Sequence, residues 1–185
     1  VIKKMVYLYL THYAAANPDL AILGINTLCK DAGDADPMVR GLAIRSLTSL
    51  RLPTVIEYVT EPVRKGLRDH SPYVRKTAVM GVLKIYHMNP VLVQESDFVN
   101  QLYNMVRDSD AKVVANCLVV LNEIMREEGG VAINKKLITY LLNRIDEFNE
   151  WGQTIVLDLV PKYTPRSDEE VRVLTVFFFF FFVFC

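Results

Sequence analysis

The chain has 185 residues with 21 Lys and Arg, 21 Asp and Glu, a formal net charge of zero and a hydrophobic fraction of 51%. This length suits one domain, and the apolar content is enough for a continuous core. A neutral chain lacks the basic excess of a general nucleic-acid-binding protein, so we expect no nucleic-acid partner.

The start of the chain and its cysteines indicate the cellular context. The first residue is Val1 and residues 1–16 already have a helical pattern, so we expect a fragment of a longer protein. Residues 1–14 lack the apolar stretch and small-residue cleavage site of a signal peptide. Cys29, Cys117 and Cys185 are far apart and odd in number, which favours reduced, buried thiols in a cytosolic protein.

Helical periodicity extends over almost the whole sequence, and the alternation typical of strands is nearly absent. Polar cap residues and following prolines mark helix starts, and the pair at 129–130, Gly-Gly, marks a helix end. We expect Thr54, Ser71, Ser96 and Asp110 to cap helices. The predicted helices are 1–16, 17–30, 34–50, 54–68, 71–87, 96–107, 110–129, 134–148 and 150–163, approximately.

The same helical pair recurs along the chain. A valine recurs five residues after the aspartate that ends the first helix of each pair, at Val39, Val74 and Val113. The copies are 35 and 39 residues apart. Small residues recur four positions later, where they would allow close helix packing. Such a period predicts an all-α, right-handed helical-repeat solenoid of the HEAT or armadillo type. The pair from 134 to 163 is a divergent repeat, with Trp151-Gly152-Gln153 in place of the earlier Pro-x-Val-Arg.

No pattern in the sequence indicates catalysis. His12, His70 and His87 are not at metal-ligand spacing, and no glycine-rich phosphate loop or nucleophile elbow is present. Glu127 and Glu128 are adjacent in a predicted helix and therefore point in different directions. We expect no enzyme activity, no catalytic residue, no metal and no cofactor.

A basic stretch is the most informative charged feature. From Arg40 to Lys84 there are nine basic and three acidic residues, which favours contact with an anionic lipid or an acidic partner. A structural interpretation is also open: Arg40 and Arg75 occupy one repeat position and pair with Asp34 and Asp69 as a ladder. The candidate partner-binding residues of this stretch are Arg64, Lys65 and Arg68.

The predicted helix at 19–30 is apolar nearly all round. One stripe contains Leu20, Leu23 and Leu28, and the other contains Ile22, Ile25 and Cys29. Such a helix is either enclosed by neighbouring repeats or carries a contact patch.

Several stretches resemble the trunk of the β-type large chains of clathrin-associated adaptor complexes. They are residues 4–10, 17–21, 36–43, 71–78, 113–117 and 151–153. The resemblance is collinear from Val1 to Val171, and residues 26–31, 41–46 and 128–135 are most similar to β chains of the fourth adaptor complex. It implies that residues 1–170 are part of an adaptin trunk.

The resemblance implies a non-catalytic scaffold of a heterotetrameric vesicle-coat adaptor in intracellular protein transport. Its expected partners are a second large chain, a medium chain, a small chain, an Arf-type GTPase and anionic membrane, on trans-Golgi or endosomal membranes and coated vesicles. The resemblance places GTPase contacts at Ile22 and Ile25. The alternative is another HEAT-repeat scaffold of the coatomer, nuclear-transport or phosphatase type.

The end of the chain departs from this pattern, because Phe177–Phe182 is an unbroken aromatic run. The run is too short for a transmembrane span and has no amphipathic face for a buried helix. We expect residues 171–185 to be a non-native product of processing or of the gene model, in which a pyrimidine-rich tract is translated.

Overall fold

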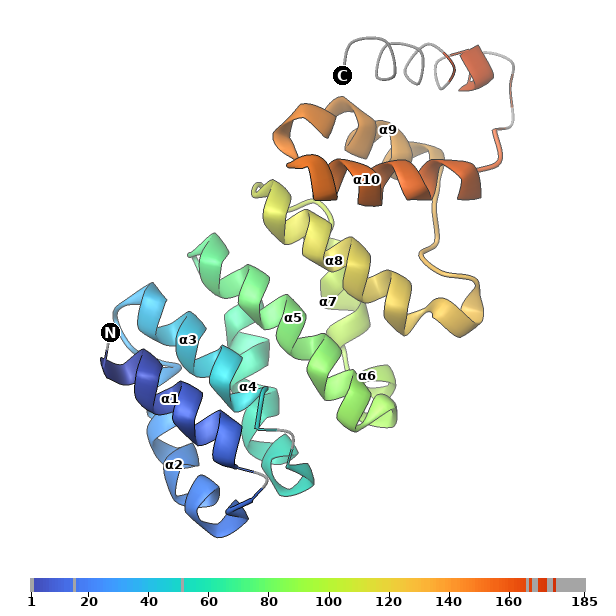
Figure 1. Ribbon diagram of the computed structural model, residues 1–185. Helices are drawn as coiled ribbons and strands as arrows, with labels where there is room; N and C mark the ends of the chain where they lie inside the picture. The colour runs from blue at the N-terminus through green and yellow to red at the C-terminus, as the bar shows by residue number, and fades with distance from the viewer. Residues whose placement is uncertain are drawn as a thin grey trace. The chain divides into compact units, whose positions relative to one another are not determined.

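The computed structural model describes residues 2–14, 16–50, 52–165, 167, 170–172 and 175. Within these residues every regular element is a helix and no strand occurs (Figure 1). The α-helices are α1 (Ile2–Tyr13), α2 (Pro18–Asp31), α3 (Pro37–Leu47), α4 (Ile56–Leu67), α5 (Pro72–Met88), α6 (Pro90–Glu95), α7 (Phe98–Met105), α8 (Ala111–Ile124), α9 (Lys135–Asn143) and α10 (Glu150–Leu159). Short 3-10 helices cover Pro53–Val55, Arg126–Glu128, Ile145–Glu147 and Val160–Lys162.

The chain forms two compact units, Val1–Val131 and Ala132–Cys185. The first contains α1 to α8 and the second contains α9 and α10. The all-α helical-repeat class expected from the sequence is confirmed. The aromatic run Phe177–Phe182 lies outside the described residues, and the assignment of residues 171–185 as non-native stays a prediction.

The first unit is built from two layers of helices. Helices α1, α3, α5 and α8 pack in succession in one layer, and α2, α4 and α7 pack against them in the other (Figure 1). The repeated apolar positions form the core between the layers. Val74, Ala78, Val82 and Ile85 of α5 are completely buried, as are Val113, Cys117 and Leu121 of α8.

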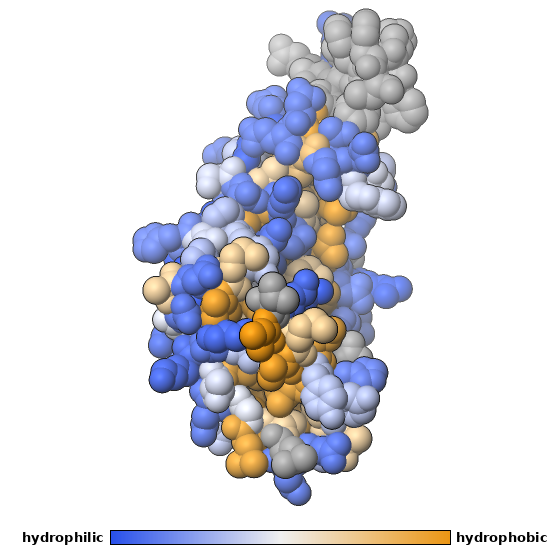
Figure 2. All heavy atoms as spheres, turned by 60° about the vertical axis from the view of Figure 1, so that its left-hand side comes forward, coloured by the Kyte–Doolittle hydropathy of each residue, from blue (hydrophilic) through white to orange (hydrophobic). Residues whose placement is uncertain are grey.

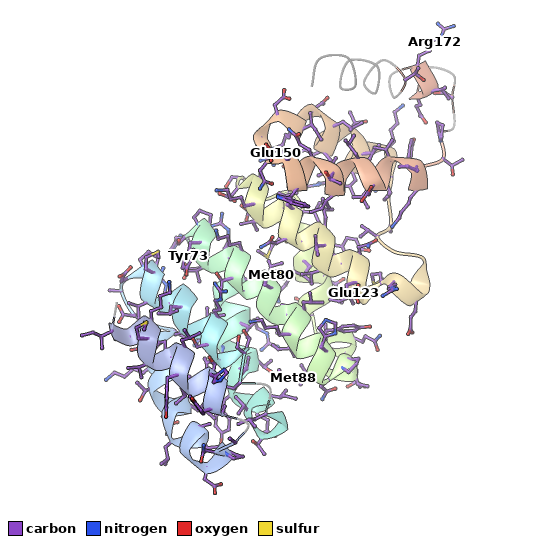
Figure 3. All side chains as sticks on the ribbon, in the orientation of Figure 1. Tyr73, Met80, Met88, Glu123, Glu150 and Arg172 are labelled. Carbon is purple, nitrogen blue, oxygen red and sulfur yellow. The ribbon has the colours of Figure 1, made fainter. Side chains whose placement is uncertain are left out.

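Glycines stand where these helices approach most closely. A Cβ atom at Gly66 of α4 would lie 2.7 Å from Ile44 Cδ1 and 2.9 Å from Ala78 Cβ. A Cβ at Gly41 of α3 would lie 2.3 Å from the ring of Tyr73, which stands at the start of α5 beside α3 (Figure 3). The absence of these side chains lets three helices pack without a gap.

The second unit is one helical pair. Leu137, Ile138 and Leu141 of α9 are buried, as are Val156 and Leu159 of α10. Both helices have a polar cap: Asn134 Oδ1 accepts the Leu137 N–H at 2.8 Å, and Asn149 Oδ1 accepts the Gly152 N–H at 3.0 Å. Gln153 lies four residues after its cap Asn149, just as Arg40 in α3 lies four residues after Asp36.

The predicted caps are confirmed in part. Asp110 Oδ1 accepts the N–H groups of Lys112 and Val113 at 2.9 and 3.1 Å. Thr54 was wrong as a cap, because a 3-10 turn at Pro53–Val55 precedes α4 and Val55 is its N-cap residue. Ser71 is the N-cap residue of α5 as predicted, although its hydroxyl makes no capping hydrogen bond.

The predicted start of the next helix at Ser96 is also wrong. Helix α7 begins at Phe98, after Asp97, and a further short helix, α6, lies in the segment assumed to be a loop. Asn89 Oδ1 caps α6 by accepting the Leu92 N–H at 3.1 Å, and Pro90 supplies the first helical residue. The Asn-Pro pair was therefore a helix-start signal that our sequence analysis overlooked.

Two arginine clamps join successive repeats. The Arg40 guanidinium donates from Nε and Nη2 to Asp69 at 2.7 and 2.8 Å, and from Nη1 to the carbonyl oxygens of Asp34 and Ala35, both at 2.9 Å. Each clamp therefore holds the turn before its own helix and the turn of the following repeat at once. Such planar, two-pronged carboxylate binding is specific to arginine.

The second clamp repeats this geometry one helical pair later. Arg75 donates to Asp108 at 2.7 and 2.8 Å and to the carbonyl oxygens of Asp69 and His70, both at 2.9 Å. The expected ladder thus exists, but its carboxylate partners are shifted by one repeat from the Arg40–Asp34 and Arg75–Asp69 pairs. The turn that precedes each arginine's own helix contributes only backbone carbonyl oxygens as hydrogen-bond acceptors.

The clamps lower the pKa of both carboxyl groups. The Arg40 hydrogen bonds lower the pKa of Asp69 against the opposing effect of burial, and the Ser71 N–H contributes to the same shift. Burial raises the pKa of Asp108, but the bonds from Arg75 and from the Asp110 N–H outweigh it. Both groups are therefore ionised in the folded chain at neutral pH.

We predict that Arg75→Met lowers the stability of the chain by about 2–4 kcal/mol, because the Asp108 carboxylate, with a side chain only 9% exposed, loses its guanidinium partner. Urea unfolding followed by circular dichroism would measure the change. Arg126→Met is the matched control, since Arg126 is 77% exposed, and should stay within about 0.5 kcal/mol of the parent. Equal effects of the two substitutions would contradict the clamp.

We further predict an acid-dependent loss of stability. Because the pKa of Asp69 is lower in the folded than in the unfolded chain, its contribution is complete above the unfolded value, about 3.9, and is lost as pH falls through the folded value. Asp69→Asn should destabilise the chain by about 1–3 kcal/mol at neutral pH. The difference from the parent should shrink when unfolding is measured at successively lower pH, down to pH of about 3. A difference that stays constant over this range would argue against the assignment.

Candidate partner-binding surfaces

The residues that helix α2 exposes differ from the two predicted stripes. Ala21, Ile25 and Leu28 form its buried face, each 2% exposed or less. Ile22 is 43% exposed and Leu23 is 74% exposed. The structure therefore does not place Ile22 and Ile25 on one accessible surface, because Ile25 belongs to the core.

Exposed apolar side chains gather on the neighbouring helix α1. Together with Ile22 and Leu23 they form a surface that we call the α1–α2 patch, and Figure 2 shows such side chains on the face that carries the N-terminal helices. An exposed apolar surface of this kind packs either against a further part of a longer chain or against a partner protein. The α1 members are Ile2, Met5, Val6, Leu8, Tyr9 and Tyr13.

A small hollow of about 100 Å³ lies between α1 and α2 at one end of the patch. Tyr9 and Tyr13 line it, with ring centroids 4.5 Å apart, beside Leu10, Ala14 and Asn17. At the other end, the buried Tyr7 hydroxyl donates a hydrogen bond to Asp31, whose carboxylate also lies 3.0 Å from Lys3 Nζ. These contacts fix α1 against the end of α2.

The three basic candidates on α4 have different environments. Arg64 lies 3.0 Å from Glu61 and places its guanidinium carbon 5.5 Å from the centre of the Phe98 ring, so it has a structural role between α4 and α7. Lys65 is 78% exposed, with a weak contact to Glu61 at 3.8 Å. Arg68 is exposed at the C-terminal end of α4.

Polar groups of α7 lie beside this basic cluster. Hydrogen bonds from Gln101 and Asn100 lower the pKa of Asp97, and the charges of Arg68 and Arg64 act in the same direction. Of the described buried polar side-chain atoms, Gln101 Oε1 lacks a hydrogen-bond partner. It is enclosed, with the residue 9% exposed, so it offers no accessible site.

The cysteines differ from each other in burial. Cys117 is completely buried as expected, whereas Cys29 is only half-buried, with its Sγ 3.8 Å from the Tyr58 carbonyl oxygen. Burial raises the pKa of both thiols, so neither is an activated nucleophile. Cys185 lies outside the described residues.

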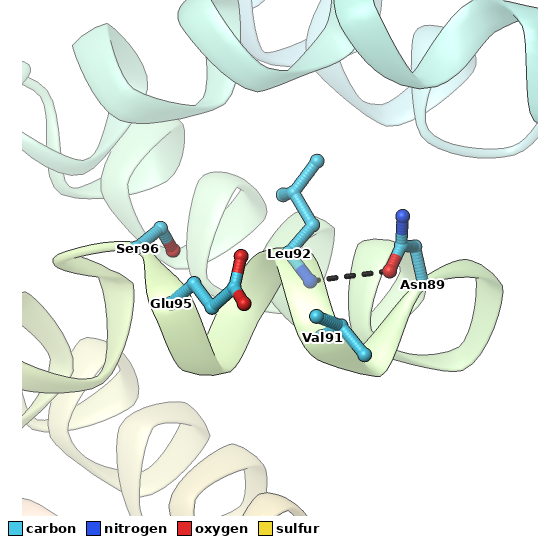
Figure 4. A pocket seen from close by; sticks show the side chains of 5 residues that line it. All are labelled: Asn89, Val91, Leu92, Glu95 and Ser96. Atoms are coloured by element: carbon cyan, nitrogen blue, oxygen red, sulfur yellow. Dashed lines mark hydrogen bonds between the residues drawn. The ribbon is translucent and has the colours of Figure 1, made fainter.

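Other surface features indicate no chemistry. An open hollow of about 450 Å³ lies on α6 between Asn89, Val91, Leu92, Glu95 and Ser96 (Figure 4). In the part of the chain that the structure describes, no group of His, Cys, Asp or Glu side chains is suited to hold a metal ion. None of the described helices reaches the length and apolarity that a bilayer crossing needs.

Further exposed cations were missed in our sequence analysis. Arg107 and Lys112 flank the turn between α7 and α8, and both are exposed. The clamp between Arg75 and Asp108 brings this turn next to the start of α5. Their positions relative to the repeated aspartates were visible in the sequence, but the closeness of the two turns was not.

Comparison with known proteins places these features in a family context. A family model described as non-SMC mitotic condensation complex subunit 1 matches residues 38–176. The chain is 52% identical to the mouse AP-4 complex subunit beta-1 over 91% of its own length and 23% of that protein. It is 48% identical to beta-adaptin-like protein A of Arabidopsis thaliana, and 40% identical to the human AP-1 complex subunit beta-1, over 92% of the chain in both cases and 22% and 18% of those proteins. The chain thus spans about a fifth of the length of these relatives.

Proposed function

The chain belongs to the β-adaptin family, with residues 38–176 in the repeat family described as non-SMC mitotic condensation complex subunit 1, and on this premise we propose that it serves as a non-catalytic scaffold of a vesicle-coat adaptor complex. The observation that carries the proposal is the collinear identity to β subunits over more than nine-tenths of the chain. The helical stack supports it, since such stacks present extended binding surfaces.

The proposed partners are those of a heterotetrameric adaptor: another large chain, a medium chain and a small chain. An Arf-type GTPase would recruit the complex to the cytoplasmic side of trans-Golgi or endosomal membranes, and the protein would also contact anionic lipid. Transport of cargo in coated vesicles is the process to which we assign it.

We place the GTPase contact on the exposed side of α2. Ile22 and Leu23 are accessible there, whereas Ile25 is buried and supports the helix from the core side. The two exposed residues belong to the α1–α2 patch, which gives the surface an apolar centre. Apolar side chains at the centre of an interface commonly dominate its binding energy.

The first test is co-purification. The protein is tagged in its own cells and isolated with and without a non-hydrolysable GTP analogue. We expect one other large adaptin, a medium chain and a small chain, with an Arf-type GTPase enriched only in the presence of the analogue. Recovery of condensin, coatomer, nuclear-transport or phosphatase subunits instead would replace the adaptor assignment by the alternative repeat scaffold.

The second test is a substitution series on α2. Ile22→Asp should reduce GTP-dependent binding of an Arf-type GTPase by about tenfold or more, because a charge replaces an apolar contact, and should leave the circular dichroism spectrum unchanged. Thr27→Asp, which places the same charge at another exposed position of α2, should bind normally. Ile25→Asp should instead unfold the chain, since Ile25 is 2% exposed. Normal binding by folded Ile22→Asp would refute the assigned contact.

A further inference from the structure

The two arginine clamps occupy fixed positions relative to the helix caps. Each arginine lies four residues after the cap of its own helix, and each acceptor lies two residues before the cap of the next repeat. The caps of α3, α5, α8 and α10 are Asp36, Ser71, Asp110 and Asn149. The same spacing would join residue 114 of α8 to residue 147 by a third clamp.

The third clamp is missing from the sequence. Residue 114 is a completely buried valine, whose side chain has no hydrogen-bond donor. The acceptor position holds Glu147, which is 51% exposed, whereas Asp69 and Asp108 are 13% and 9% exposed. The Glu147 carboxylate accepts instead from Arg144 Nε at 2.8 Å, three residues earlier in the chain. Glu147 is thus paired inside the second unit.

The loss of a clamp changes what holds successive repeats at a fixed angle. A guanidinium fork sets both the distance and the direction between the two turns that it joins. Rotation of one clamped turn against the other would leave a carboxylate with little exposure to solvent without its partner, which is costly. Burial of a valine stabilises without a preferred direction, so it opposes such a rotation far less.

The connection that follows α8 is built to change its backbone angles. The chain divides into its two units between residues 131 and 132, within the connection 129–134. Gly129 and Gly130 have φ angles of 93° and 91°, and a Cβ atom at Gly129 would have no neighbour within 4 Å. Glycine adopts such angles and others with little steric cost. By contrast, a single residue, Asn89, separates α5 from α6.

We propose that the connection 129–134 is a hinge. The first unit moves as one rigid body, because the clamps fix its turns, and the pair of α9 and α10 changes its orientation as a second body. The missing clamp between positions 114 and 147 carries the proposal, and the two glycines supply the backbone freedom. Hinges are commonly a few residues at the ends of regular elements that absorb large changes in φ and ψ. The hinge is a property of the repeats and does not depend on the adaptor assignment.

The test measures distances between pairs of spin labels in the full chain by double electron–electron resonance. The labels are attached to an introduced keto amino acid, so the native cysteines stay unchanged. One pair, at Arg45 of α3 and Val119 of α8, spans the clamped repeats, and the other, at Val119 and Asp158 of α10, spans the hinge. All three positions are exposed. We expect the second pair to give a distance distribution at least about twofold broader than the first. Equal widths would overturn the proposal.

Substitutions then test whether the clamps cause this difference. Arg75→Met should broaden the distribution between positions 45 and 119 at least about twofold, with folding checked by circular dichroism. Arg75→Lys keeps the charge but loses the planar fork, so it should broaden the same distribution and decides the matter if Arg75→Met unfolds. Arg126→Met, the matched control, removes a charge that is 77% exposed and should leave the distribution unchanged. No broadening in a folded Arg75 variant, or equal broadening in the control, would overturn the proposal.

Discussion

The two-pronged pairing of one arginine with an aspartate of the next repeat is the constraint on which the stack depends. Each clamp satisfies four bonds of a single guanidinium group, two to a carboxylate and two to backbone oxygens. A lysine would provide neither the planar fork nor the fixed direction. With the turns fixed in this way, the apolar positions of α3, α5 and α8 meet in register, and Gly41 and Gly66 can stand where helices come closest.

Local signals in the sequence predicted most of the helices, because caps and prolines act within a few residues, but they missed α6 and misplaced the starts of α4 and α7. Asp110 caps α8 as predicted, and the structure adds Asn134 and Asn149 as caps of α9 and α10. Ion pairs between residues that are distant in the sequence were harder to predict. The clamp partners are 29 and 33 residues apart, and a chain of equivalent aspartates offers more than one choice. The sequence likewise did not predict which side of α2 is buried. The directions in which Ile22 and Ile25 point depend on the neighbouring helices as well as on periodicity.

The first unit combines an uncovered apolar surface with a row of ion-paired turns. The α1–α2 patch consists of apolar side chains that nothing in the described structure covers, whereas the turns before α3, α5 and α8 are held together by ion pairs with little exposure to solvent.

The clamps also decide where this architecture accepts changes in length. An aspartate, a cap residue and an arginine follow one another at the same spacing in two repeats, as Asp34, Asp36 and Arg40 and as Asp69, Ser71 and Arg75. The side of the stack formed by the turns before α3 and α5 therefore has a fixed geometry. The copies nevertheless differ by four residues in period, and the extra length lies at the opposite ends of the helices, where α6 is inserted between α5 and α7. One side of the stack therefore has a fixed spacing, and the other side accepts inserted residues. A loop or a tag added within the unit should be placed on the side that holds α6.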